Sequence, residues 1–221
     1  MKYKCLVLDH DDTTVSSTAE IHFPCFVEYL SKFRPEIKDN YSLNSYLVKN
    51  FHPGITSLLR DEVGLSEKEM DDEVEYWANY VESHIPTVYP GMREIMLDFK
   101  AEGGIIAVAS HSFVRYIMRD YRHNSLPMPD AIYGWDLPPE KRKPYPYALI
   151  DIMERFSLSP FDILVVDDLK PGYDMARAAG VDFAAAGWAH DIPEIEGFMR
   201  AHCDYYFKTR EELFDFLFRQ E

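Results

Sequence analysis

Two aspartates near the start of the chain have the spacing and setting of catalytic carboxylates. Asp9 and Asp11 come directly after the apolar run Cys5–Leu8. Four apolar residues without helical period, followed at once by polar ones, predict a buried parallel strand that ends in a loop. Ligands bind at the carboxyl ends of the strands in open α/β sheets. Two carboxylates there need a cation or a proton to offset their charge, although aspartate is also common in ordinary turns.

Polar side chains follow other apolar runs in the same way. Ser110 ends a second run, the pair Asp167-Asp168 ends a third, and Lys143 precedes a proline in a loop before a short predicted helix. Taken singly, Ser110 is explained by a helix cap and Lys143 by a surface charge. Because doubly wound sheets bring the carboxyl ends of neighbouring strands together, the combination favours one shared site.

Such a set of side chains is suited to phosphoryl transfer. Several carboxylates form a hard oxygen site for Mg²⁺, which also binds phosphate oxygens. With Mg²⁺ and Lys143 neutralising charge, a phosphoryl group can approach Asp9, which would act as nucleophile. Asp11 would protonate the leaving oxygen and then activate water. Ser110 and Lys143 would bind the phosphoryl oxygens.

The elements needed to position these residues are predicted as alternating strands and helices. Helical patterns end at Gly103-Gly104 and at Gly180, and Thr209 with Glu212 predicts a capping box. This alternation predicts an α/β fold, a doubly wound parallel sheet with a Rossmann-like core. The predicted strands are Cys5–Leu8, Ile105–Ala109, Ala131–Tyr133, Ile163–Val166, Phe183–Ala186 and, more weakly, Tyr205–Phe207.

The segment 16–87 interrupts this alternation with helical patterns alone. Apolar residues recur at helical spacing from Phe23 to Phe33 and from Met70 to Val81, and Ser66 with Glu69 predicts a second capping box. We therefore expect a catalytic core formed by residues 1–15 and 88–221, with residues 16–87 inserted as an all-helical cap domain. Both connections leave close to the first aspartates, so the insert is expected to cover them as a lid that excludes water and selects substrates.

Composition limits the classes of partner. The 221 residues, 47% of them hydrophobic, allow one substantial core with a small accessory domain. The formal net charge of −15 argues against nucleic acid and against anionic membranes. Three scattered cysteines predict reduced thiols, and the absence of a signal peptide or a long apolar stretch predicts a cytoplasmic protein. A monomer is favoured, although the sequence leaves the oligomeric state open.

With these motifs in place, the sequence resembles the haloacid dehalogenase superfamily, in its helical-cap subfamily of β-phosphoglucomutase and small-molecule phosphatases. The segments Gly172 to Gly180 and Tyr89-Pro90-Gly91 resemble further parts of that subfamily. The resemblance implies that Mg²⁺ is held by Asp9, the Asp11 backbone carbonyl and Asp168, with Asp167 beside it. The four matching motifs are Val7-Leu8-Asp9-His10-Asp11-Asp12-Thr13, Ala107-Val108-Ala109-Ser110, Lys143-Pro144-x-Pro146 and Val165-Val166-Asp167-Asp168.

The first motif departs from the family pattern. Asp12 stands where the family usually has glycine, and His10 replaces an apolar residue. Asp12 is interpreted as a loop residue rather than a carboxylate near the metal. His10 is interpreted as a packed or hydrogen-bonded support.

The sequence therefore predicts a Mg²⁺-dependent phosphatase that acts on a small phosphorylated metabolite. Asp11 argues against dehalogenation, because family dehalogenases lack the second aspartate. A β-phosphoglucomutase-like phosphotransferase remains the alternative enzyme, and a catalytically degenerate phosphometabolite-binding protein remains the alternative of another class. A phosphoacceptor receiver domain is disfavoured by the order of its acidic residues. The expected substrate contacts are His111, beside Ser110, and His22, Lys49 and His52 in the cap.

Overall fold

A computed structural model describes residues 2–219, and these residues divide into two compact units. One unit comprises residues up to Val15 and from Thr87 onward, and the other is Ser16–Pro86. Two short strands lie where the chain passes from one unit to the other, β2 (Val15–Ser16) and β3 (Thr87–Val88), and they pair with each other. Strands of two residues leave no periodic pattern, which is why the sequence did not predict them.

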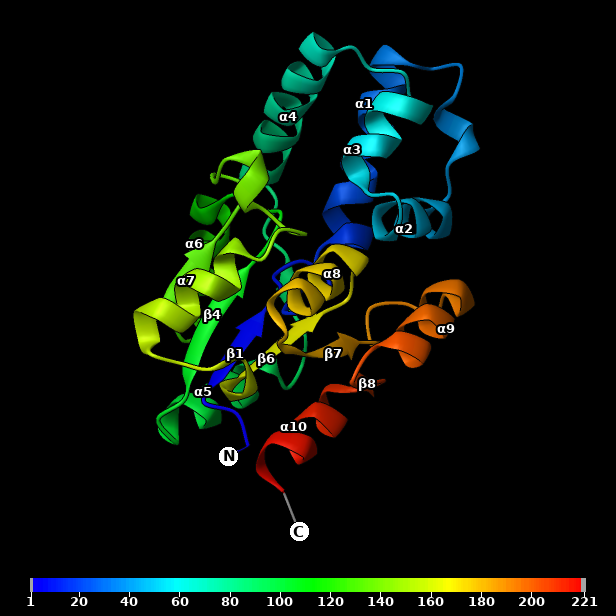
Figure 1. Ribbon diagram of the computed structural model, residues 1–221. Coiled ribbons are helices and arrows are strands. Elements are labelled where there is room, and N and C mark those ends of the chain that lie inside the picture. The colour runs from blue at the N-terminus through cyan, green and yellow to red at the C-terminus, as the bar shows by residue number, and fades with distance from the viewer. Residues whose placement is uncertain (1, 220–221) are drawn as a thin grey trace. The chain divides into compact units, whose positions relative to one another are not determined.

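The first unit contains a six-stranded parallel sheet in the order β5-β4-β1-β6-β7-β8 (Figure 1). The predicted α/β class and parallel sheet are confirmed. Sequence order reverses at β1, which lies between β4 and β6 and so has ligand-binding loops on both sides. The strands are β1 (Cys5–Leu8), β4 (Ile105–Ala109), β5 (Ala131–Tyr133), β6 (Ile163–Asp167), β7 (Asp182–Ala186) and β8 (Tyr205–Phe207).

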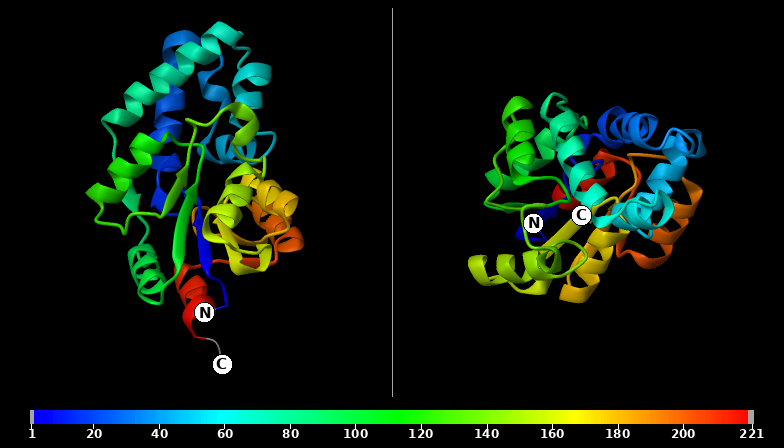
Figure 2. Two further views of the ribbon diagram at one scale, coloured as in Figure 1. Left: turned by 60° about the vertical axis from the view of Figure 1, so that its left-hand side comes forward. Right: turned by 90° about the horizontal axis from the view of Figure 1, so that it is seen from above.

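Helices pack against both faces of this sheet (Figure 2). Leu6 and Leu8 of β1 are fully buried in a cluster with residues of α5, α6 and α10. On the other face, α8 contacts β6, β7 and α7. The helices are α5 (Met92–Ala101), α6 (Val114–His123), α7 (Tyr147–Phe156), α8 (Lys170–Ala179), α9 (Pro193–His202) and α10 (Arg210–Phe218), with short 3₁₀ turns η4 (Pro139–Lys141) and η5 (Pro160–Asp162).

Local sequence explains the ends of several of these helices. The predicted capping box of Thr209 with Glu212 is present at the start of α10. Gly180 ends α8 in the left-handed conformation, at φ 68°. The same helix begins at Lys170, directly before Pro171. Proline is tolerated there because the first turn has no partner for the missing N–H.

The second unit is built from helices around an aromatic core. Phe26, Tyr29 and Leu30 of α1 are buried with Tyr46 of α2 and Leu58. The capping box predicted at Ser66 and Glu69 opens α4. The helices are η1 (Thr18–His22), α1 (Phe23–Phe33), η2 (Lys38–Asn40), α2 (Leu43–Phe51), α3 (Ile55–Ser57), η3 (Leu58–Glu62) and α4 (Glu67–Glu82). Among residues 2–219, no helix has the length and apolar character required to cross a bilayer.

Candidate active site

Three adjacent strands place the candidate residues at one edge of the sheet. Asp9 follows β1, Ser110 follows β4, and Asp167 is the last residue of β6. The strand neighbours are in register, since Leu8 pairs with Val108 on one side and with Val166 on the other. The backbone N–H of Asp9 continues this ladder and donates to the Val166 carbonyl at 2.9 Å. Parallel pairing in this register therefore brings polar residues from distant parts of the sequence to the same place.

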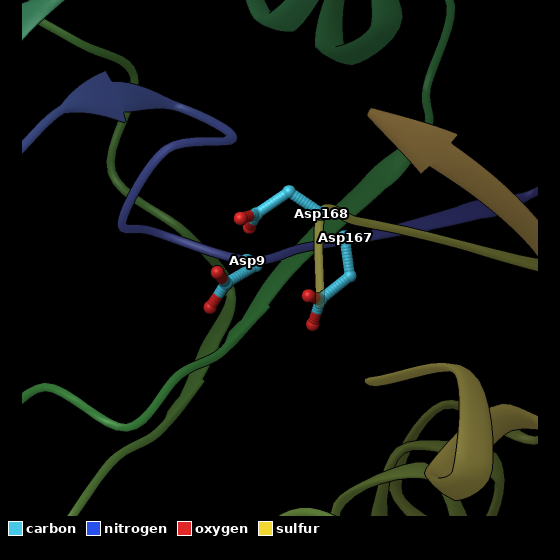
Figure 3. Close-up of side chains that lie close together, drawn as sticks. All are labelled: Asp9, Asp167 and Asp168. Atoms are coloured by element: carbon cyan, nitrogen blue, oxygen red, sulfur yellow. The ribbon is translucent and has the colours of Figure 1, made fainter. Parts of the chain in front are cut away.

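Three of the predicted metal ligands lie close together. One carboxylate oxygen from each of Asp9, Asp167 and Asp168 lies within 4.8 Å of the others, and all three residues are buried (Figure 3). Buried, converging carboxylate oxygens are the ligand type that Mg²⁺ prefers. The donor set in this structure therefore fits a hard divalent cation.

Lys143 connects two of these carboxylates. Its Nζ lies 2.9 Å from Oδ1 of Asp9 and 2.7 Å from Oδ2 of Asp167, and its side chain is only 4% exposed. The other oxygen of Asp167 accepts a hydrogen bond from the Leu169 backbone N–H at 2.8 Å. Gly172 makes room for this arrangement, because a Cβ there would lie 2.0 Å from Oδ2 of Asp167. Asp167 thus has both oxygens engaged, one by Lys143 and the other by the Leu169 N–H.

The charge of the site is unbalanced. Besides the three clustered aspartates, Asp12 is also buried, at 5% exposure. Burial, reinforced by Asp12 and Asp167, raises the pKa of Asp168 well above its usual range. Burial lowers the pKa of Lys143, but Asp167 and Asp9 raise it by more, so this lysine stays charged. The Lys143 ammonium contacts two of the three clustered carboxylates, so the cluster favours a further cation.

The loop of the first motif is closed by its own threonines. The Thr14 hydroxyl donates to the Asp9 carbonyl at 2.7 Å, and the Thr13 hydroxyl donates to Oδ1 of Asp168 at 3.2 Å. Asp12 takes the left-handed backbone conformation, at φ 57°, in the position where glycine is usual. Aspartate tolerates this region better than most residues. The departure at Asp12 therefore preserves the turn that a glycine would make.

His10 lies in the core between the two aspartates of the motif. It is 1% exposed, and its Nε2 lies 3.0 Å from Oδ2 of Asp120 on α6. The other oxygen of Asp120 is paired with Arg119 at 2.7 Å. His10 is thus a hydrogen-bonded support for the loop. No local pattern predicts the role of Asp120, because its partner is 110 residues away.

Asp11 and Ser110 share a neighbour that the sequence reasoning missed. The Ser112 hydroxyl donates to Oδ2 of Asp11 at 2.5 Å, and its backbone N–H donates to Oγ of Ser110 at 3.1 Å. Ser110 and Ser112 are each 4% exposed. The alternation of Ser110, His111 and Ser112 after a strand was the available signal, but its meaning depends on the distant Asp11.

His111 contacts the protein at one ring nitrogen, and its predicted contact with substrate stays a prediction. Its Nε2 lies 3.0 Å from the Lys143 carbonyl, and its ring packs edge-on against Trp135. Burial and the Lys143 charge lower the pKa of His111 to about 4. The ring is therefore neutral at pH 7, and its Nε2–H donates to the carbonyl, which can only accept. His111 thereby supports the backbone that carries Lys143.

The three predicted cap contacts belong to the second unit. His22 accepts a hydrogen bond at Nδ1 from the indole N–H of Trp77 at 3.1 Å, so its neutral ring carries its proton on Nε2. Lys49 pairs with Glu62 at 2.5 Å. His52 is exposed at the end of α2. A role for these three residues toward substrate stays a prediction.

Comparisons with known proteins agree with this arrangement. The chain is 29% identical over 126 residues to a phosphoglycolate phosphatase from Pseudomonas putida, a match that covers 52% of this chain and 43% of that protein. The chain thus matches less than half the length of this curated relative.

Solved structures match over nearly the whole chain. A protein from Bacteroides fragilis described as a haloacid dehalogenase-like hydrolase has a TM-score of 0.79 at 20% identity, covering 96% of this chain and 100% of its own. A predicted phosphatase from Clostridium acetobutylicum has a TM-score of 0.77 at 18% identity, covering all of both chains. At these identities the likeness concerns the fold.

The family is shown by a match to its sequence model. The description of that family is haloacid dehalogenase-like hydrolase, and residues 7–186 match it. This range includes all four motifs, from Asp9 to Asp168. The chain belongs to the haloacid dehalogenase-like hydrolase family.

Proposed function

We propose that this protein is a Mg²⁺-dependent phosphatase that hydrolyses a small phosphorylated metabolite through an aspartyl-phosphate on Asp9. The proposal is carried by the convergence of Asp9, Asp167 and Asp168 within 4.8 Å, with the Lys143 ammonium 2.9 Å from Asp9. A nucleophile beside a divalent-cation site and a fixed positive charge is the combination that phosphoryl transfer needs.

In the first half-reaction, a carboxylate oxygen of Asp9 attacks phosphorus as the bond to the leaving oxygen breaks. The electron pair goes to the leaving oxygen, which takes a proton from Asp11. Lys143 is within hydrogen-bond distance of Asp9, so it would also reach an oxygen of the phosphoryl group bound there. Ser110 would donate its hydroxyl to the same group.

In the second half-reaction, a water attacks phosphorus and gives its proton to Asp11, and phosphate leaves with Asp9 restored. Asp9, Asp168 and the Asp11 carbonyl would hold Mg²⁺, with Asp167 beside it. The bound ion would neutralise charge on the phosphoryl oxygens and on the clustered carboxylates. Asp167 has both oxygens engaged, which supports a role in anchoring Lys143.

We also propose that the unit Ser16–Pro86 is the cap that selects the substrate. It begins five residues after Asp11, and the strands β2 and β3 at its two connections pair with each other. His22, Lys49 and His52 are the residues proposed to contact the leaving group. Phosphoglycolate is the first substrate to test, since the curated relative is a phosphatase for it.

The decisive experiment compares the native protein with Asp9→Asn. We expect the native protein to hydrolyse p-nitrophenyl phosphate and phosphoglycolate only in the presence of Mg²⁺. Rapid quenching during turnover should trap a phosphoryl group from the substrate on a carboxylate of the native protein. Asp9→Asn should abolish both, whereas Asp130→Asn, which removes a carboxylate paired with Lys100, should leave both unchanged. Absence of turnover by the native protein over a panel of phosphate esters, or labelling that persists in Asp9→Asn, would refute the proposal.

A further inference from the structure

Ser112 is a buried side chain beside the reacting groups that has no part in the mechanism above. Its hydroxyl donates to Oδ2 of Asp11 at 2.5 Å, and its backbone N–H donates to Oγ of Ser110 at 3.1 Å. One residue thus touches both the proposed acid and a proposed phosphoryl-binding hydroxyl. The contact with Asp11 links loops that are 101 residues apart in the sequence.

The backbone of Ser112 is held in place by the loop that follows β5. Its carbonyl accepts a hydrogen bond from the Trp135 N–H at 2.9 Å. Gly134 packs directly against it, since a Cβ on Gly134 would lie 2.6 Å from the Ser112 carbonyl oxygen. The Val114 N–H, two residues on, donates to Asp136 of the same loop at 2.7 Å. The hydroxyl of Ser112 therefore starts from a fixed point, with rotation about χ1 as its main freedom.

A hydrogen bond from this fixed point restrains the carboxyl group of Asp11. The terminal torsion of aspartate is broad, so an unrestrained carboxyl group samples many planes. Donation to Oδ2 selects one plane and so fixes the direction of the other oxygen. A hydroxyl can donate to the ionised carboxylate and, after rotation, accept from the protonated form. Ser112 can therefore support Asp11 in both protonation states that the two half-reactions require.

The second contact of Ser112 restrains Ser110. Its N–H occupies an acceptor position on the Ser110 hydroxyl oxygen. The hydroxyl proton of Ser110 must then point away from Ser112, which leaves it free to donate to a phosphoryl oxygen.

We propose that Ser112 is a positioning residue that orients Asp11 for proton transfer to the leaving group. The proposal rests on the phosphatase function proposed above and on the role of Asp11 in it. Misplacing a reacting group by about 1 Å costs on the order of 100-fold in rate, so a lost orienting contact should be measurable.

The test measures kcat/KM for phenyl phosphate and p-nitrophenyl phosphate, which have nearly the same shape. This constant reports steps up to departure of the leaving group, which is where Asp11 acts as acid. Phenolate needs protonation more than nitrophenolate does. Ser112→Ala should therefore lower kcat/KM about tenfold for phenyl phosphate and less than about threefold for p-nitrophenyl phosphate. Ser112→Thr, which keeps a hydroxyl, should restore most of the loss.

A double-mutant cycle with Asp11→Asn separates orientation of Asp11 from direct substrate binding. If Ser112 acts through Asp11, Ser112→Ala should have almost no further effect on phenyl phosphate in the Asp11→Asn background. Additive losses would overturn the proposal, and so would an equal loss for both esters in the single variant or no loss at all. Ser31→Ala, which removes an exposed hydroxyl bonded to the Val27 carbonyl in α1, is the control.

The outcomes distinguish this proposal from the proposed function. Native protein that turns over no phosphate ester of the panel in Mg²⁺ defeats both. A different result defeats the role of Ser112 alone. In that case the native protein is active and Asp11→Asn loses more kcat/KM for phenyl phosphate than for p-nitrophenyl phosphate, whereas Ser112→Ala loses the same for both esters. Thermal melting of each variant shows whether Ser112→Ala is folded, and Ser112→Cys, which replaces the hydroxyl by a weak donor of similar size, supplies the test if it is not.

Discussion

Replacement of Lys143 by methionine tests how much the charge of this lysine stabilises the folded protein. The substitution keeps most of the apolar stem and removes the ammonium group, which bonds Asp9 and Asp167 at 2.9 and 2.7 Å. The buried carboxylates of Asp9 and Asp167 would then lose their contact with this ammonium group. We expect Lys143→Met to be strongly destabilising in the absence of divalent cations, because uncompensated buried charge is costly.

The size of the effect follows from the geometry. At these distances and an effective dielectric constant of about 20, each Lys143–carboxylate contact has a Coulomb energy of about 6 kcal/mol. Desolvation of the three groups cancels much of this, and removal of one partner from a buried pair typically costs about 3–5 kcal/mol. For a chain of this length such a loss lowers the melting temperature by roughly 6–10 °C.

The deficit should depend on pH in a defined direction. Burial and the charge of Asp9 raise the pKa of Asp167, and Lys143 opposes this rise. Without Lys143 the pKa rises further, so the folded variant binds more protons than the unfolded chain above pH 4. Its stability therefore falls as pH increases, and the deficit relative to the native protein grows from pH 5 to pH 8.

The assay is thermal melting of the native protein and the variant at pH 5 and pH 8, with EDTA and then with Mg²⁺. Mg²⁺ should recover part of the loss. Lys100→Met is the matched control, because Lys100 pairs with Asp130 at 3.0 Å on the surface of the same unit, with side chains 28% and 37% exposed. We expect this control to cost about 0–1 kcal/mol. A Lys143→Met melting temperature within about 2 °C of the native value at pH 8 in EDTA would refute the reasoning.

Three further predictions concern other parts of the molecule. Asp168→Asn should raise the Mg²⁺ concentration for half-maximal activity about tenfold or more, and an unchanged metal titration would exclude Asp168 as a ligand. Gly172→Ala places a Cβ 2.0 Å from Oδ2 of Asp167, so we expect the contact between Asp167 and Lys143 to be displaced. The free energy of unfolding measured in urea should fall by about 1–3 kcal/mol, and kcat should fall at least about tenfold. Burial raises the pKa of Glu73 in α4 to about 7. The folded protein then holds a proton that the unfolded chain has lost, so the free energy of unfolding should fall as pH rises from about 4.5 to 7. Glu73→Gln should abolish this fall, which amounts to up to about 3 kcal/mol.

The predictions for Gly172 and Glu73 each have a matched control in the chain. Gly197→Ala, at a helical glycine whose added Cβ would meet no atom within 4 Å, should be neutral or slightly stabilising. If Gly172→Ala behaves in the same way, the close approach to Asp167 does not matter. Glu75→Gln, exposed on the same helix as Glu73, should leave the pH dependence of stability as it is in the native protein. If the stability of Glu73→Gln varies with pH as that of the native protein does, Glu73 does not have a raised pKa.

Local patterns in the sequence were sufficient for the architecture of the core. Four predicted strands, from Cys5–Leu8 to Tyr205–Phe207, have the bounds that the structure gives, and the other two are longer by one residue. A continuous apolar run reports burial on both faces of a parallel sheet, and this signal is local. The rule that strand ends meet then placed Asp9, Ser110 and Asp167 at one edge. The capping boxes at Ser66 and Thr209 are local for the same reason.

The sequence by itself thus determined the sheet, the helical insertion and the identity of the carboxylates around Asp9. The tertiary structure alone decided how these groups are supported: Ser112 on Asp11, Asp120 on His10, and Asp167 on Lys143. The physical reason is that strand and helix patterns arise from neighbours a few residues apart. Each supporting hydrogen bond depends instead on the exact approach of segments 24 to 110 residues apart, which exists only once the sheet is packed.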